Sequence, residues 1–231
     1  MFGLQITVGS VVFYPVALRL TIQASKEKLI KKIEVDDSTV AGEQIMRIIT
    51  GKARGLKLKT PNGLSTRPTA DRVKESLFNI LNGLINFSEV ENVLDIFAGT
   101  GALGLESISR GAKSATFIDA ATTEILRENI RRTKFTDCII LRGDFEKNLR
   151  RLCEKTLSFD LIFSDPPYAT GLAQKSLMLV AQMNLPKIGG LIVVEHGAAE
   201  TLDIPQNFSL IRKTTCGSTT AFEIFERTIS P

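Results

Sequence analysis

Short apolar runs alternate with amphipathic segments along the chain from residue 92 onward. Apolar runs bounded by turn residues predict strands, and apolar positions that recur every three or four residues predict helices. We expect strands at 92–97, 114–119, 138–142, 159–164, 189–195, 208–213 and 220–227, and helices at 101–110, 121–134, 144–155 and 170–184. Strands that alternate with helices predict an α/β fold with a parallel sheet covered on both faces. The last two strands have no long helix between them, so we expect them to form an antiparallel terminal hairpin in a mostly parallel seven-stranded sheet.

A smaller pattern precedes this alternation. The residues on both sides of Gly51-Lys-Ala-Arg-Gly55 alternate or run apolar, which predicts a small β-hairpin with a basic turn. Residues 1–45 show no clear periodicity, and we interpret them as an N-terminal extension without a fixed structure or as the product of a start codon assigned too early. We therefore expect three parts: the extension, a basic hairpin and helix at 46–88, and the main domain at 89–231.

A helix is expected to follow the hairpin. Thr69 is expected to cap it and Asp71 lies in its first turn, where a carboxylate is favourable. Arg72 and Lys74 fall outside the apolar stripe and are expected to face a polyanion. The stripe that would dock the helix on the main domain consists of Val73, Leu77, Ile80, Leu81 and Leu84.

Composition narrows the classes of protein. The chain has 231 residues, 43% of them hydrophobic, which is enough for one α/β core with a small appendage. No run reaches the roughly 20 apolar residues of a membrane span. Cys138, Cys153 and Cys216 form no closely spaced pair, so we expect a reducing, cytoplasmic setting. A single histidine, His196, argues against a histidine metal site or a Ser-His-Asp triad.

The positive charge is concentrated in one segment. Although the net charge is only +4, residues 46–74 carry eight basic side chains against Asp71 alone. A short basic segment beside a larger domain is typical of a protein that grips a phosphate backbone. The basic residues are Arg47, Lys52, Arg54, Lys57, Lys59, Arg67, Arg72 and Lys74.

Residues 93–119 read as a buried strand, a glycine-rich turn, a helix and a second strand that ends in an acid. Gly99 and Gly101 permit a sharp turn and a close approach to a ligand, because neither carries a Cβ. Asp119 lies where a carboxylate can accept both hydroxyls of a ribose, about 20 residues beyond the first glycine. This pattern predicts a site for a nucleoside cofactor, but the glycines alone do not say which one.

A second motif indicates the chemistry. The predicted strand 159–164 leads directly into Asp165-Pro166-Pro167-Tyr168. Two prolines stiffen the turn and leave carbonyl acceptors without matching N–H donors, and Asp165 adds a carboxylate. Acceptors beside the Tyr168 ring suit a planar base with an exocyclic amine that has been turned out of its stack. Held in this way, the amine can attack an electrophilic methyl group, with placement and fixed dipoles supplying most of the rate.

Several motifs together resemble a known family. The residues Asp95-Ile-Phe-Ala-Gly-Thr-Gly-Ala-Leu-Gly-Leu-Glu106 with Asp165-Pro-Pro-Tyr168 resemble the class I, Rossmann-like, S-adenosylmethionine-dependent amino-methyltransferases. The segments 46–55, 66–81 and 109–112 narrow the resemblance to the RsmD family, which methylates the N2 amine of a guanine in 16S ribosomal RNA. The resemblance covers residues 46–227 and implies 16S rRNA, or the assembling small subunit, as the partner of a monomeric enzyme.

The resemblance also implies roles for individual residues. Asp165, Pro166, Pro167 and Tyr168 would form the catalytic corner. S-adenosylmethionine would be bound by Asp95 and Phe97, by Gly99 and Gly101 at its methionine part, by Asp119 at the ribose, and by Asp144 and Phe145 at the adenine. RNA would be bound by Arg47, Lys52, Arg54, Lys57, Arg67 and Arg72.

Three other functions use some of the same features. An NAD-dependent oxidoreductase would use the glycines and Asp119, but it leaves Asp165-Pro-Pro-Tyr168 without a task. A noncatalytic RNA-binding module would need the basic segment but not the amine-acceptor motif. A DNA adenine or cytosine amino-methyltransferase shares that motif, but such enzymes usually carry a sizeable target-recognition domain, for which residues 1–45 are too few.

Overall fold

The computed structural model describes residues 46–61 and 69–229. Its strands are β1 (Asn92–Ile96), β2 (Ser114–Asp119), β3 (Cys138–Arg142), β4 (Phe159–Ser164), β5 (Pro186–Gly197), β6 (Phe208–Cys216) and β7 (Thr220–Arg227). Its helices are α2 (Thr69–Asn82), α3 (Ala102–Arg110), α4 (Thr123–Thr133), α5 (Phe145–Glu154), α6 (Leu172–Gln182) and the short 3₁₀ turn η1 (Phe87–Glu89). The predicted strands and helices are therefore confirmed. The largest differences are that β5 and β6 extend beyond the predicted ranges.

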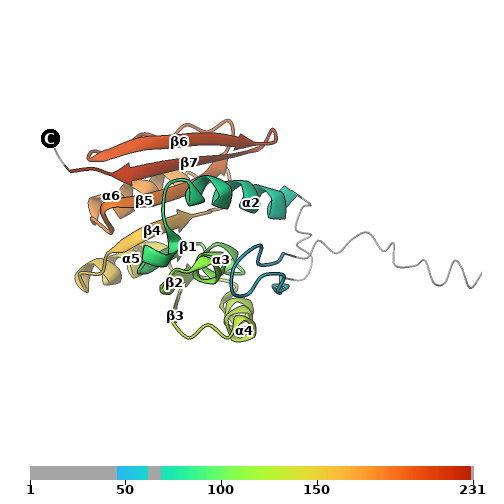
Figure 1. The fold of residues 1–231 in the computed structure, drawn as a ribbon. Coiled ribbons are helices and arrows are strands. Elements are labelled where there is room, and N and C mark those ends of the chain that lie inside the picture. The colour runs from blue at the N-terminus through green and yellow to red at the C-terminus, as the bar shows by residue number, and fades with distance from the viewer. Residues whose placement is uncertain (1–45, 62–68, 230–231) are drawn as a thin grey trace, which may run out of the picture. The chain divides into compact units, whose positions relative to one another are not determined.

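The strands form one seven-stranded sheet in the order β3-β2-β1-β4-β5-β7-β6 (Figure 1). Strands β1 to β5 pair in parallel, whereas β7 is antiparallel to both β5 and β6. The expected terminal hairpin is thus confirmed. The strand order reverses between β1 and β4, and an open sheet of this kind leaves a crevice at the carboxyl ends of the strands on either side of that point.

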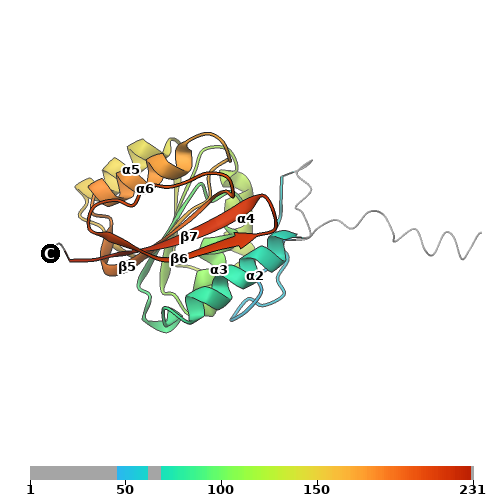
Figure 2. The same ribbon diagram turned by 90° about the horizontal axis from the view of Figure 1, so that it is seen from above.

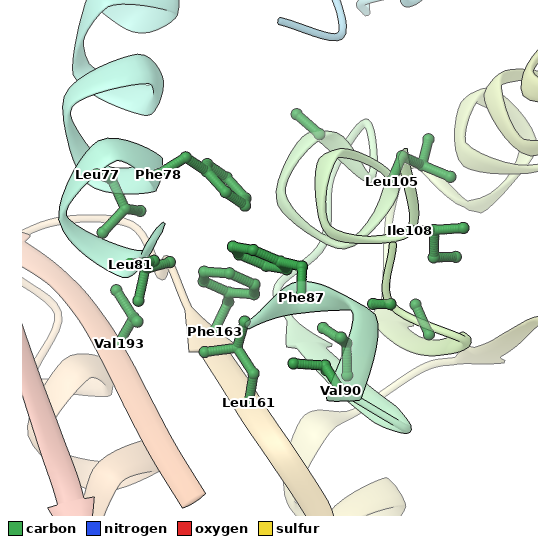
Figure 3. Close-up of a cluster of buried hydrophobic side chains, with 14 of the residues drawn as sticks. Leu77, Phe78, Leu81, Phe87, Val90, Leu105, Ile108, Leu161, Phe163 and Val193 are labelled. Atoms are coloured by element: carbon green, nitrogen blue, oxygen red, sulfur yellow. The ribbon is translucent and has the colours of Figure 1, made fainter. Parts of the chain in front are cut away.

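Helices cover both faces of the sheet. Figure 2 shows α5 and α6 on one side and α2 and α3 on the other. On the α2 side, the ring centroid of Phe78 lies 5.7 Å from that of Phe87 and 5.8 Å from that of Phe163. These contacts join α2, η1 and β4 (Figure 3). Aromatic pairs at this spacing add to the apolar area that they bury. None of the helices in the described part of the chain is both long and apolar enough to cross a membrane.

The predicted basic hairpin is present in a reduced form. One antiparallel bridge pairs Arg47 with Lys57, and Ile48 exchanges backbone hydrogen bonds with the opposite run, donating to Leu56 and accepting from Gly55. Ile48 and Leu58 are buried in the same apolar cluster as α2, α3 and the sheet. The hairpin is thus continuous with the core, and Gln44–Pro231 forms one compact unit. The expectation for residues 1–45 falls outside the described residues.

A buried carboxylate fixes this hairpin to α3. Glu106 is fully buried, and its oxygens accept from the backbone N–H groups of Ile49 (2.7 Å) and Thr50 (3.0 Å). Arg110 Nε donates to it at 2.8 Å, and Lys74 Nζ lies 3.7 Å away. The expectation that Lys74 faces a polyanion is therefore wrong. It is 5% exposed, and burial lowers the pKa of its ammonium group, although the charge of Glu106 opposes that shift.

Candidate active site

A cleft of about 760 Å³ opens at the carboxyl ends of the parallel strands, where the strand order reverses. Its walls combine apolar rings with carboxylates, which suits an amphipathic ligand with a ring system and hydroxyl or amino groups. It is lined by Phe97, Ile118, Asp119, Ala120, Ala121, Gly143, Asp144, Phe145, Asp165, Pro166, Pro167 and Tyr168. The structure thus brings the predicted acceptor corner and several of the predicted cofactor residues into one cavity.

The glycine-rich turn lies between β1 and α3 beside this cleft. Gly99 and Gly101 have φ angles of +57° and +79°, values that L side chains rarely adopt. A Cβ on Gly101 would also come within 2.4 Å of Leu126 Cδ1. Gly104 is required for packing, because a Cβ there would lie 2.4 Å from Phe117 Cε1. The local sequence therefore allows α3 to begin close against β1 and β2.

Asp95 supports the turn from below. Its carboxylate accepts the Gly104 N–H at 2.9 Å, and the residue is 1% exposed. Burial raises the pKa of Asp95 to about 7, with a further contribution from the negative charge of Asp119, and the hydrogen bond from Gly104 opposes the shift. Asp95 is absent from the cleft lining, so its contact with a cofactor stays a prediction.

Asp119 is held by the protein on both carboxylate oxygens. Its Oδ2 accepts from Gly99 N at 3.0 Å, and its Oδ1 accepts from Ala121 N at 2.9 Å and from the backbone and hydroxyl of Thr122. The carboxylate therefore ties the glycine turn to the start of α4. Each carboxylate oxygen has about two acceptor positions, so Oδ2 keeps one for a ligand hydroxyl.

The opposite wall of the cleft comes from the start of α5. Asp144 caps this helix, since its Oδ1 accepts a hydrogen bond from the backbone N–H of Lys147 at 2.9 Å. The Asp144 side chain is exposed and lines the cleft. The Phe145 ring packs 4.8 Å from the ring of Phe97, which itself has a positive φ of 61°. A flat apolar surface next to a carboxylate acceptor fits a purine ring with an amino group.

The Asp165-Pro-Pro-Tyr168 corner follows β4 directly. Asp165 is exposed through the mouth of the cleft but surrounded by protein on its other sides, and this raises its pKa well above the usual carboxyl range. The negative charges of Glu195 and Asp95 add to the rise. The register of the parallel strands β1, β4 and β5 explains why these three acids lie close together. Asp165 lies two residues beyond the residue of β4 that pairs with Asp95, and Glu195 lies two residues beyond the residue of β5 in the same row.

The sequence did not predict which residues form hydrogen bonds with Tyr168. Its hydroxyl donates to Glu195 Oε1 near the end of β5 and lies 2.9 Å from Thr220 Oγ1 at the start of β7. Burial, followed by the hydrogen bond to Glu195, raises the pKa of the Tyr168 phenol. Glu195 could have been recognised as a site residue from its position at the end of the predicted buried strand 189–195, because acids at the carboxyl ends of parallel strands gather at one edge of the sheet.

The basic hairpin, which carries four of the predicted RNA-binding residues, runs along α3. The turn with exposed Lys52 and Arg54 packs on the last turn of that helix, where Lys52 N donates to Ser109 O at 2.8 Å. The other end of the hairpin meets the glycine turn, since Thr100 Oγ1 lies 3.1 Å from Met46 Sδ. Nine residues of helix separate the two ends by roughly 13 Å.

The remaining predicted RNA contacts differ in their partners. Arg47 is exposed but forms a 3.1 Å ion pair with Asp71. Lys57 and Arg72 are also exposed, and neither forms an ion pair with another described residue. Arg67 lies outside the described residues.

Comparison with known proteins places this geometry in a family. A family model described as conserved hypothetical protein 95 matches residues 46–225. The chain is 36% identical over 190 residues to ribosomal RNA small subunit methyltransferase D of Haemophilus influenzae, covering 81% of this chain and 95% of that protein. The solved structure of the candidate methyltransferase yhhF of Escherichia coli shares 32% identity and superposes with a TM-score of 0.68, covering 80% of this chain and 99% of the other.

A more distant structure shares the fold. SMU.776, a candidate methyltransferase solved in complex with SAH, is 15% identical with a TM-score of 0.58, covering 73% of this chain and 53% of the other. The family match confirms the resemblance found in the sequence. This chain belongs to the ribosomal RNA small subunit methyltransferase D family (RsmD, conserved hypothetical protein 95) and has the fold of the class I methyltransferases.

Proposed function

We propose that this protein transfers a methyl group from S-adenosylmethionine to the exocyclic N2 amine of a guanine in 16S ribosomal RNA, acting in the cytoplasm as a monomer on the RNA or on the assembling small subunit. The observation that carries the proposal is the shared cleft, in which Asp165 and Tyr168 face the same 760 Å³ space as Asp119 and Asp144. The names of the family relatives support ribosomal RNA as the substrate.

The residues present fit the cofactor. Asp144 offers an acceptor for the adenine amine, the tilted rings of Phe97 and Phe145 offer apolar surface, and Asp119 keeps an acceptor position for a ribose hydroxyl. Gly99 and Gly101 allow the backbone to approach the methionine part. When bound, the cofactor supplies a methyl group on a positively charged sulfur.

The chain's own groups would act on the amine. Asp165 and the carbonyl of Pro166 accept hydrogen bonds from the exocyclic NH₂, while the Tyr168 ring covers one face of the base. The amine nitrogen would become positively charged as it bonds to the methyl carbon, while the carbon–sulfur bond breaks and S-adenosylhomocysteine leaves, and the Asp165 carboxylate would stabilise that charge. A carboxyl group with a raised pKa is then suited to receive the departing proton.

Replacement of Asp165 tests this proposal. Asp165→Asn keeps the size and one acceptor but removes the charge, and we expect kcat for methylation of under-methylated 16S RNA to fall by about 100-fold or more, the range of a lost acid-base group. Binding of S-adenosylmethionine, measured by calorimetry, should change little. Mass mapping of the product RNA should place the methyl group on a guanine.

Two results would contradict the proposal. Unchanged turnover of Asp165→Asn would remove the amine contact, and methylation of duplex DNA in place of RNA would favour the amino-methyltransferases of DNA. The matched control is Asp160→Asn, because this carboxylate lies on the same strand at its opposite end and pairs with Lys187 at 2.7 Å. The control should leave turnover unchanged.

A further inference from the structure

The Tyr168 side chain is anchored at its far end by two neighbouring strands. We propose that Glu195, assisted by Thr220, is a positioning residue that fixes the Tyr168 ring in the orientation in which it stacks on the acceptor base. This inference rests on the proposed function, because it takes the Tyr168 ring as the stacking surface. It gives a task to a carboxylate that neither the cofactor motif nor the acceptor corner uses.

The contacts explain why an anchor is needed. Tyr168 follows two prolines beyond the end of β4, and it is 39% exposed, so packing alone covers only part of its ring. Its hydroxyl donates to Glu195 Oε1 and lies 2.9 Å from Thr220 Oγ1. A hydrogen bond to a charged acceptor is among the stronger ones in proteins. The contacts with Glu195 and Thr220, both at the end of the side chain, restrict both of its rotatable bonds.

Both anchoring residues belong to the rigid sheet. Glu195 of β5 pairs with Phe222 of β7 and Gly197 pairs with Thr220, so Glu195 and Thr220 are diagonal neighbours on two antiparallel strands. Sites supported by strands are held more precisely than sites that rely on a loop. Contacts with β5 and β7, and not the Asp165-Pro-Pro-Tyr168 corner alone, therefore fix the position of the Tyr168 ring.

The backbone beside Tyr168 is tied to the same end of β5. Glu200 Oε1 accepts from Ala169 N at 3.1 Å and from Gly197 N at 3.2 Å. Within the corner, Thr170 Oγ1 donates to Pro167 O at 2.6 Å. Because the ring and the following backbone are held separately, loss of the Glu195 contact should loosen the ring without releasing the corner.

Glu195 also acts on the charge of Asp165. The ionisable groups that face Asp165 from the described elements are Asp95 from β1, Glu195 from β5 and the Tyr168 phenol from the corner itself. The negative charge of Glu195 raises the pKa of Asp165, so its removal should lower that pKa. A carboxylate with a purely structural role would leave the pH profile of the reaction unmoved.

The kinetic test compares Glu195→Ala, Glu195→Gln, Tyr168→Phe and the double variant Tyr168→Phe/Glu195→Ala. We expect Glu195→Ala and Tyr168→Phe each to lower kcat about tenfold, the factor of one charge-assisted hydrogen bond, with KM for RNA nearly unchanged. Glu195→Gln should retain more activity than Glu195→Ala, because the amide oxygen still accepts from the phenol. Its acid limb of kcat/KM should shift to lower pH.

The double variant decides whether Glu195 acts through the phenol. If it does, the double variant is no slower than either single variant, because the contact is already lost. Losses that multiply would overturn the proposal, and so would an unmoved acid limb in Glu195→Gln. The control is Glu226→Gln at the opposite end of β7, which should change neither kcat nor the pH profile.

A spectroscopic readout is independent of turnover. The chain has no tryptophan and two tyrosines, Tyr14 and Tyr168, so Tyr14→Phe leaves Tyr168 as the only emitter of its kind. A carboxylate that accepts the phenol proton quenches tyrosine fluorescence, so adding Glu195→Ala should raise the emission. Equal emission would refute the anchor itself, whereas a wild-type protein that methylates no RNA would refute the proposed function.

Discussion

Replacement of the buried Glu106 should weaken the whole compact unit, because three hydrogen bonds and a further ion pair converge on its carboxylate. Two of the hydrogen bonds come from backbone N–H groups of the hairpin at 2.7 and 3.0 Å, the third comes from Arg110 Nε at 2.8 Å, and the ammonium of Lys74 forms the ion pair at 3.7 Å. Glu106 is fully buried, and the side chains of both cations are 6% exposed. In Glu106→Ala, two positive charges and two backbone donors would remain in the interior without their acceptor.

The size of the effect follows from these contacts. Breaking a buried ion pair by removing one partner destabilises a protein by about 3–5 kcal/mol. Domains have a free energy of unfolding of about 5–15 kcal/mol, so the loss is a large share of the total. At about 2–4 °C per kcal/mol for a unit of this size, the melting temperature should fall by roughly 10 °C. Glu106→Gln should lose less, because one oxygen still accepts.

Urea denaturation followed by circular dichroism measures this difference. The matched control is Glu124→Ala, whose carboxylate pairs with Arg127 on α4 but is 78% exposed, so this replacement should change the free energy of unfolding far less. Hydrogen exchange should locate the damage, with faster exchange at Ile49 and Thr50 than elsewhere. A loss in Glu106→Ala no larger than that of the control would refute the assignment of Glu106 as the residue that holds the hairpin.

Two further predictions concern the buried acid and the basic turn. Asp95 has a folded-state pKa of about 7 against an ordinary 3.8, so the folded protein holds this proton more tightly, and the Asp95 contribution to stability falls as pH rises from about 4 to 7. Asp95→Asn should therefore gain about 3 kcal/mol of stability relative to wild type between pH 5 and pH 8 in urea denaturation, because about two pH units separate pH 5 from the folded-state pKa, and a constant difference would contradict the raised pKa. Lys52→Ala/Arg54→Ala should weaken RNA binding and lower the salt slope by about two units in titrations at several salt concentrations. Lys155→Ala at the end of α5 should leave that slope unchanged, and an unaltered slope in the double variant would exclude the turn from the interface.

The strands of the sheet could be predicted from the sequence because the features that mark each strand lie close together in the chain. Each strand shows a short apolar run, and Gly99, Gly101 and Asp165 mark the ends of two strands by residue type alone. Parallel strands then force these ends to one edge, so the location of the cleft follows without knowledge of any long-range contact. The register of β5 against β7 could not be read in the same way, and the Tyr168–Glu195 contact depends on it.

Lys74 shows most clearly what helical periodicity in the sequence cannot predict. Its position off the apolar stripe predicts an exposed charge, and that reasoning holds for a helix with one packed face. The hairpin covers a second face of α2, so Lys74 Nζ meets the carbonyl of Arg47 and the carboxylate of Glu106, which lie 27 and 32 positions away in the chain. No periodicity within α2 reports that contact.

Glu106 and the acids that line the carboxyl edge of the sheet are balanced in different ways. Glu106 is matched by two cations and two backbone donors, which is the arrangement of a carboxylate that stabilises a fold. Asp95, Asp119, Asp165 and Glu195 gather at the carboxyl edge of four strands, and none of them forms an ion pair with another residue in the described part of the chain. Burial, and after it the mutual repulsion of these carboxylates, raises the pKa of Asp95 and Asp165, so this edge of the sheet destabilises the protein when it stands alone. On the proposed function, a positively charged sulfonium cofactor and then a positively charged amine would relieve that repulsion, which gives the uncompensated acids a role at the proposed site of methyl transfer.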